Sequence, residues 1–304
     1  MDLSNCAPSF GRYEFVIRRI HSLLGLIPIG GYLAFHLLTN ASIVDGVDVY
    51  QRRADQIHDL GVTTVVILLE WPVIFLPILF HGVIGMLIVC RGKRNVATYP
   101  YVGNIRYTLQ RAAGVVAFAF ILWHVFHMHG WLKFGWWTSD VVRPLGGGVF
   151  DPAHAYTAAK AIQASIWIQW IYAIGVLACV YHFANGLWTM GITWGIWTGP
   201  RAQRWANIPC AAIGVFLAVA GLVALVGMVK AEPPAPSAGP GSMVRRAESV
   251  LQGVPAPLAR RASEGSVAMK WVFCVPRLRF GLVSSSAACC DFIGTGDIWT
   301  RGSR

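Results

Sequence analysis

Charged residues are scarce in this chain, and acidic residues are the scarcest of them. Of the 304 residues only 13% are charged, with 14 Asp and Glu against 25 Lys and Arg, whereas 55% are hydrophobic. Soluble domains carry about 25% charged residues. The composition therefore argues against a soluble domain and is typical of a protein that crosses a membrane several times.

Sequence signals of several other protein classes are also missing. The seven cysteines form no CxxC pair and show no metal-binding spacing, so they do not indicate a disulfide scaffold or a zinc site. The first residues, MDLSNCAPSFGRYEF, lack the compact apolar segment and the cleavage site of a signal peptide. We therefore expect the first apolar segment to be a retained membrane span.

The net charge of +11 does not indicate a nucleic-acid partner, because the basic residues cluster in short connections between apolar segments. Ten of them fall on the side of the N-terminus and six on the opposite side. This bias predicts a cytoplasmic N-terminus and an outward end for the fifth span. The ten are Arg12, Arg18, Arg19, Arg91, Lys93, Arg94, Arg106, Arg111, Arg201 and Arg204; the six are Arg52, Arg53, Lys133, Arg143, Lys160 and Lys230.

Five apolar segments are long enough to cross about 30 Å of hydrocarbon as helices of about 20 residues. We predict an all-α membrane protein in which residues 1–230 form a five-helix domain. After Lys230 a linker rich in Pro, Ala and Gly begins, and we expect 231–304 to be a largely disordered C-terminal extension. The five predicted spans are 20–43, 62–90, 107–132, 164–196 and 206–229.

Each of the first four predicted spans carries a histidine well inside its apolar stretch, and the fifth carries none. Ionisable residues inside a membrane are costly, so they are by default candidates for function. A single one can simply bond a neighbouring carbonyl, but one in each of four helices is harder to explain in that way. The four are His36, His81, His124 and His182.

The depth of these histidines can be estimated from the helical rise of about 1.5 Å per residue. His36 precedes Asp45 and His124 precedes Lys133 by the same number of residues, which places both about 14 Å from the outer end of their helices. Both are therefore expected at one level of the membrane.

The other two histidines are expected at a second level. The number of residues between His81 and Arg91 places His81 about 15 Å from the inner end of its helix. His182 lies slightly to the inner side of the midpoint of its long helix. Two imidazoles from facing helices at one depth can hold a b-type haem iron through its axial positions. Spacing therefore favours a four-helix bundle around two haems, and a proton path or a transporter site remains as an alternative.

The local sequences around the histidines resemble a known family, the cytochrome b membrane-anchor subunits of succinate dehydrogenases and fumarate reductases. The similarity is to the single-subunit, five-helix, two-haem type and covers about residues 10–229. Four motifs carry it, in the expected order: RRIHSLLG, LFHGVIG, LWHVF and YHFANGLW.

The resemblance implies that His36, His81, His124 and His182 are haem axial ligands, paired His36 with His124 and His81 with His182. It also implies a flavoprotein subunit with FAD and an iron–sulfur subunit as partners, with succinate chemistry on a partner. The resemblance further implies that this chain carries electrons through two b haems to a quinone, menaquinone, in a bacterial inner membrane. A di-haem cytochrome b of a hydrogenase or formate dehydrogenase is an alternative, although that family lacks FANGLW.

Several further residues are candidates for supporting roles. His21, Arg19 and Arg111 are candidate contacts to haem propionates, or else interfacial cations that face lipid headgroups. Glu70 is a candidate proton relay for quinone chemistry. His127 lies about one turn from His124 and is a candidate for the quinone site. His129 is expected to point away from His124, near water.

Overall fold

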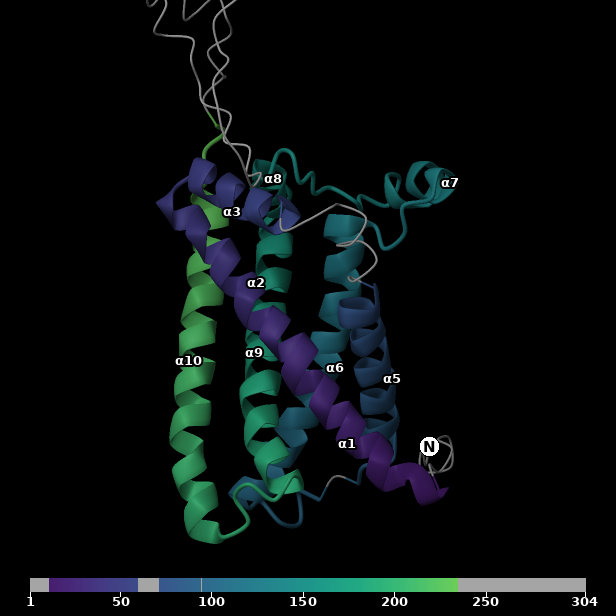
Figure 1. The fold of residues 1–304 in the computed structure, drawn as a ribbon, viewed down its shortest axis with the longest axis vertical. Helices are drawn as coiled ribbons and strands as arrows, with labels where there is room; N and C mark the ends of the chain where they lie inside the picture. The colour runs from purple at the N-terminus through teal and green to yellow at the C-terminus, as the bar shows by residue number, and fades with distance from the viewer. Residues whose placement is uncertain (1–10, 60–70, 94, 235–304) are drawn as a thin grey trace, which may run out of the picture. The chain divides into compact units, whose positions relative to one another are not determined.

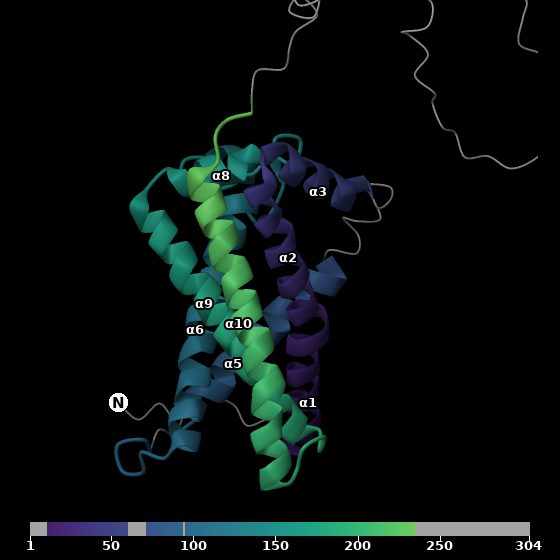
Figure 2. The same cartoon turned by 90° about the vertical axis from the view of Figure 1, so that its left-hand side faces the viewer.

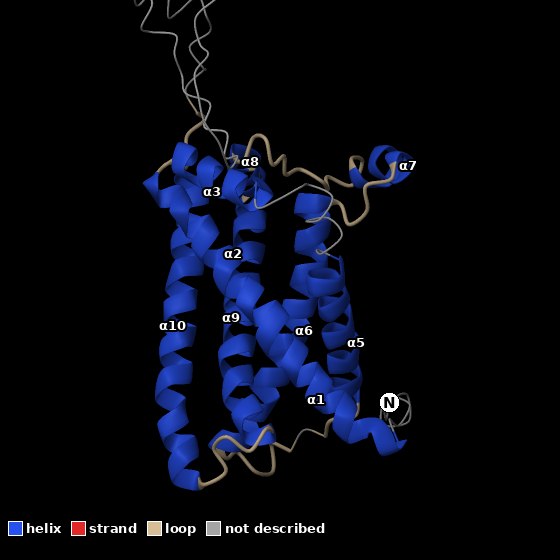
Figure 3. Cartoon of the chain, viewed as in Figure 1, coloured by secondary structure: helices blue, strands red, loops and turns tan. Residues whose placement is uncertain are grey.

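The computed structural model describes residues 11–59, 71–93 and 95–234. Within these ranges the chain is helical and contains no strand (Figure 3). Five of the described helices are long and apolar enough to cross a membrane, which confirms the predicted all-α membrane fold. They are Gly11–Asp45, Trp71–Cys90, Val102–His129, Ile166–Thr193 and Pro200–Lys230.

The membrane-spanning helices lie side by side, as Figures 1 and 2 show. Helix α9 (Ile166–Thr193) packs against α6 (Val102–His129) on one side and α10 (Pro200–Lys230) on the other. Helix α10 also packs against α2 (Gly31–Ala41). The fifth span therefore closes one side of the bundle that the histidine-bearing helices form.

The first span is a continuous helical segment with an irregular centre. Helix α1 (Glu14–Leu24) and α2 are joined by the π-helical turn η3 (Gly25–Gly30), which contains Pro28. Proline lacks the N–H that a regular helix uses at this position, which explains why the irregular turn occurs here. This turn packs against both α5 (Leu76–Cys90) and α9, so the irregularity lies where three spans meet.

Among the span boundaries that differ from the predicted ones, two have a clear local cause. Helix α6 ends at His129 because Gly130 adopts a left-handed conformation with a φ of 81°. Helix α9 begins only at Ile166, where the Ser165 side chain accepts a hydrogen bond from the backbone N–H of Trp167. The residues before Ser165 form a separate short helix, α8 (Tyr156–Gln163).

The remaining boundaries follow from charge and from the described ranges. The first span already begins at Gly11, since the helix continues through Arg18 and Arg19, whose charges lower the hydropathy of that stretch. The second span is described from the turn η5 (Trp71–Phe75) onward, and residues 60–70 lie outside the described part. Residues 235–304 also lie outside it, so disorder of the extension stays a prediction.

Two short helices, α3 (Val47–Asp59) and α8, lie at the end of the bundle where α2 and α10 finish (Figures 1 and 2). Sequence analysis did not predict them, because neither is long or apolar enough to span a membrane. Their apolar faces cover a buried cluster that includes Ile43, Tyr50 and Tyr172. This end of the bundle is therefore closed by packed side chains.

Candidate functional site

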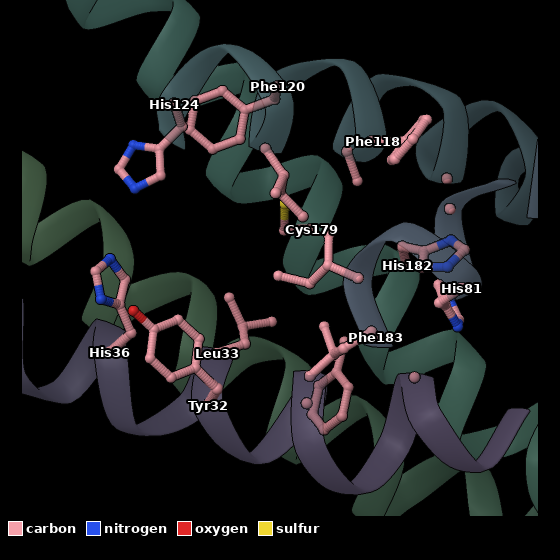
Figure 4. A pocket seen from close by; sticks show the side chains of 18 of the residues that line it. Tyr32, Leu33, His36, His81, Phe118, Phe120, His124, Cys179, His182 and Phe183 are labelled. Carbon is pink, nitrogen blue, oxygen red and sulfur yellow. The ribbon is translucent and has the colours of Figure 1, made fainter. Parts of the chain in front are cut away.

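One cavity runs along the interior of the bundle and is lined by all four histidines of the spans, as the close-up in Figure 4 illustrates. Its volume is about 1900 Å³. Pockets for a single small ligand usually measure about 300–1,000 Å³. The cavity therefore has room for more than one bound group.

The first histidine pair joins α5 and α9. The ring centres of His81 and His182 are 5.9 Å apart and the rings are inclined by 82°. Nδ1 of His81 lies 2.8 Å from the backbone oxygen of His21, and Nδ1 of His182 lies 3.1 Å from that of Gln110. A carbonyl can only accept, so each Nδ1 carries the hydrogen and each Nε2 is left with a free lone pair.

Two glycines allow neighbouring helices to approach this pair closely. A Cβ atom built on Gly25 would overlap the His81 ring, and one built on Gly114 would lie 2.8 Å from Cε1 of His182. Real Cβ atoms essentially never make contacts this short. Each imidazole is therefore seated against the bare backbone of an adjacent helix, which restricts its rotation.

A hydrogen-bonded network of polar side chains holds the His182 end of the cavity together. The Gln110 side chain donates to the backbone oxygen of His182 at 3.1 Å, and Asn185 donates to Gln110 at 2.6 Å. Arg106 in turn donates to Asn185 and, at 2.6 Å, to Asn207 of α10. Sequence analysis did not single out Asn185 or Asn207, although Asn185 belongs to the motif YHFANGLW. The network links α6, α9 and α10 around His182.

The second histidine pair joins α2 and α6. The ring centres of His36 and His124 are 5.9 Å apart and the rings are inclined by 71°. Nδ1 of His124 lies 3.2 Å from the hydroxyl of Tyr172, while the Asn40 side chain donates to the backbone oxygen of His36 at 2.7 Å. The ring of Phe120 stacks on His124 at 5.6 Å. This pair is thus held by side chains where the first is held by the backbone.

Apolar side chains occupy the region between the two pairs. Figure 4 shows Leu33, Phe118, Cys179 and Phe183 there, with one histidine pair at each end. Phe183 and Phe118 fill the space beside two helix glycines, and Cys179 is buried. An apolar interior of this kind disfavours charge, so any charged part of a bound group would be expected at the polar ends of the cavity.

The predicted supporting residues at the His81–His182 end occupy different surroundings. His21 stacks on His81 with ring centres 4.0 Å apart, and its Nδ1 is buried without a hydrogen-bond partner in the described part of the chain. The same holds for Nε of Arg111, and both residues line the cavity. Arg19 instead donates to the backbone oxygen of Thr193 at 3.1 Å and does not line the cavity.

The three candidates near the His36–His124 end also differ in their surroundings. Glu70 lies outside the described residues. His127 is buried against Tyr172 and does not line the cavity. His129 lines the cavity and is partly buried, with its ring 6.1 Å from that of Phe75 in η5, and its expected place near water stays a prediction.

The ring spacing of each pair is compatible with one metal-centred group held between its two imidazoles. The separation of 5.9 Å between ring centres leaves space for one metal atom with metal–nitrogen bonds of about 2 Å on each side. Metal-ligating histidines usually donate their other ring N–H to a carboxylate, a backbone carbonyl or water. The Nδ1–H groups of His81 and His182 donate to backbone carbonyls in this way. Among the described residues no group of three or more His, Cys, Asp and Glu side chains could hold a metal ion. Paired imidazoles are therefore the ligand sets that this region offers.

Fold and site together define the class: a multi-pass α-helical membrane protein with two intramembrane histidine pairs. No family model matches the chain. A curated relative is the succinate dehydrogenase cytochrome b558 subunit of Bacillus subtilis (strain 168), which is 34% identical over 220 residues, or 72% of this chain and 99% of the relative. The chain belongs to the family of succinate dehydrogenase cytochrome b subunits, which confirms the resemblance seen in the motifs.

Proposed function

We propose that this chain is the membrane-anchor cytochrome b of a succinate:quinone oxidoreductase and carries electrons between a partner subunit and a quinone. The family relation supports a role in such a complex, since the relative is by name a subunit of succinate dehydrogenase. Oxidation of succinate to fumarate, which releases two electrons and two protons, would take place on a flavoprotein subunit. An iron–sulfur subunit would deliver the electrons to this chain.

The observation that carries the proposal is the presence of two equivalent histidine pairs in one cavity, each with ring centres 5.9 Å apart. His81 with His182, and His36 with His124, would each hold one b haem through Nε2. A haem bound in this way supplies reversible one-electron chemistry at a potential that its surroundings set. The chain's own contribution is to fix the ligands, to exclude water and to set the local polarity.

Polar side-chain nitrogens at the His81–His182 end suit the propionates of a haem. Nδ1 of His21 and Nε of Arg111 face the cavity and have no hydrogen-bond partner in the part of the chain that the structure describes. A buried donor without a partner is costly, so a bound acceptor there would stabilise the site. Arg19 has the weakest support as a propionate contact, because its guanidinium is engaged by Thr193.

We place the quinone, by preference menaquinone, at the His36–His124 end of the cavity. His129, Trp71 and Phe75 line that end and would offer a polar edge and aromatic faces to a quinone ring. Glu70, just before Trp71 in the sequence, keeps its proposed role as a proton relay. His127 is less suited to contact a quinone, since its ring is buried away from the cavity.

We also propose that the protein lies in a bacterial inner membrane with its N-terminus in the cytoplasm. The test uses two single cysteines in a variant that lacks the native ones, at the exposed residues Lys93 and Ser139 on opposite connections. A membrane-impermeant thiol reagent added to spheroplasts should label the cysteine at Ser139 and spare the one at Lys93. The reverse labelling would contradict the proposed orientation.

The decisive experiment is haem quantitation on the purified complex, together with a dithionite-reduced minus oxidised spectrum. We expect two b haems per copy of this chain and reduction of both by succinate through the partner subunits. A preparation without b haem would overturn the proposal, and one haem per chain would overturn its two-site form. A histidine-dependent transporter would bind no haem, so this measurement also separates the alternative.

A further inference from the structure

His124 is connected through the buried side chain of Tyr172 to a second histidine, His127, which does not line the cavity. The hydroxyl of Tyr172 lies 3.2 Å from Nδ1 of His124 and 3.0 Å from Nδ1 of His127. Tyr172 is only 5% exposed and His127 only 7%. His124 and His127 lie on successive turns of α6, and Tyr172 reaches them both from α9.

Aromatic side chains surround this hydrogen-bonded connection. Trp123 stacks on His127 with ring centres 4.8 Å apart, and it meets the Tyr172 ring edge-on at 5.4 Å. Phe120 contacts the Tyr172 ring edge-on at 5.6 Å. The shared hydroxyl therefore lies in mostly aromatic surroundings, and hydrogen bonds in low-dielectric surroundings are stronger than in water.

The direction of the hydrogen bonds follows from the atoms available. A hydroxyl has one hydrogen to donate, and each neutral imidazole Nδ1 either carries a hydrogen or accepts one. The two Nδ1 atoms therefore cannot both accept from Tyr172: at least one donates to its oxygen, and the other either accepts from its hydroxyl or donates as well. If His124 holds an iron through Nε2, its Nδ1 carries the hydrogen and donates to Tyr172; the hydroxyl hydrogen of Tyr172 is then available to Nδ1 of His127, which lies 3.0 Å away.

We propose that Tyr172 and His127 are positioning residues that act through His124: they fix its ring and its electron donation, and so set the reduction potential of the group bound at the His36–His124 pair. This inference rests on the proposed function. The acceptor for His124 is a side chain whose oxygen is polarised by His127, whereas His81 and His182 donate to backbone carbonyls. His127 thus influences, through Tyr172, how strongly His124 donates electrons to a bound metal.

The sign of the effect follows from second-partner chemistry. A hydrogen bond from Nδ1–H raises the basicity of a ligating imidazole, which favours the oxidised metal. Removing the acceptor by Tyr172→Phe should favour the reduced state of one haem. We expect a rise in its midpoint potential equivalent to a several-fold to about tenfold change in the reduction equilibrium, and tenfold corresponds to about 59 mV for one electron.

The experiment is redox potentiometry and low-temperature EPR on the purified complex of each variant. The haem in question is first identified as the one missing from His36→Ala. Tyr172→Phe should keep both haems, raise the potential of that haem alone and shift its low-spin ferric signal. Tyr156→Phe is the matched control, since it removes a phenol hydroxyl at the same end that touches no histidine, and it should change neither potential.

His127 provides an independent arm that remains informative if Tyr172→Phe fails to assemble. His127→Phe removes the acceptor for Tyr172 and should raise the same potential by less, whereas His127→Gln keeps an acceptor oxygen and should stay nearer to the wild type. Two haems with unchanged potentials in His127→Phe, or equal shifts of both haems, would overturn the inference. A wild type with fewer than two haems would instead overturn the proposed function.

Discussion

The two ends of the cavity present histidine pairs of nearly the same geometry in unlike surroundings. Both pairs have ring centres 5.9 Å apart. At one end His81 and His182 donate to backbone carbonyls and rest against helix glycines. At the other end His124 meets the hydroxyl of Tyr172. One end is thus set by how closely the helices approach, and the other by which side chains are present.

The largest expected effects come from removing one histidine of a pair. His182→Ala should abolish one b haem and leave the other, and His36→Ala should abolish the other one, because each proposed haem would be held by both histidines of its pair. Haem content and the reduced spectrum measure this. His154→Ala, which alters an exposed histidine in a connection, should keep both haems. Loss of both haems from either single variant would show that the two ends do not bind independently.

The next effect isolates the backbone contact at the His81–His182 end. Gly25→Ala should displace the His81 ring and destabilise its haem, at a cost of about 1–3 kcal/mol typical of overpacking. The spectrum of the other haem should not change. Gly31→Ala is the matched control on the same span, since a Cβ there meets nothing within 4 Å. Haem retention on heating measures the response of each variant. Equal haem loss from the two variants would contradict the proposed contact.

A third change tests the polar network that only the His182 end possesses. Asn185→Leu removes the partner of Gln110 and one partner of Arg106, and buried polar groups left without a partner cost about 1–3 kcal/mol. We expect earlier thermal release of the haem at that end, measured by its absorbance. Asn104→Leu, near the start of α6 and outside this network, should have little effect. Release of the other haem first would count against the network's local role.

The smallest effect concerns the His36 end. The Tyr50 hydroxyl donates to Asn40 at 3.1 Å, and Asn40 donates to the backbone of His36. Tyr50→Phe should cost about 0.5–1.5 kcal/mol at neutral pH. This change can be followed as the midpoint of thermal unfolding of the complex.

Tyr50, which lies outside the membrane spans, should also make the stability of the folded protein depend on pH. Burial raises the pKa of Tyr50 to about 12 from its ordinary value of 10.0. The unfolded chain therefore loses this proton first, and the wild type should lose stability as the pH rises from about 10 toward 12. Tyr50→Phe lacks this contribution, so its disadvantage should shrink over that interval. A difference between the two proteins that stays constant from pH 8 to 11.5 would refute the assignment.

The spans and the pairing of the histidines could be predicted from the sequence, and other features could not. Long apolar runs specify membrane helices, and the constant helical rise gives depth, so His36 was correctly grouped with His124 and His81 with His182 by proximity. Their role as ligands remains a proposal. The surroundings of His127 and His129 depend on which neighbour faces each side of α6, and sequence spacing along one helix carries no such information.

By itself the sequence determined the all-α membrane fold and which segments form the five spans, although not where each helix begins, because hydropathy is a local property. Only the tertiary structure decided that Tyr172 joins His124 to His127, that Gly25 supports the His81 ring and that Asn185 links three helices. These contacts depend on the rotation and approach of helices packed against one another. That packing is a property of pairs of helices, which no single segment of sequence specifies.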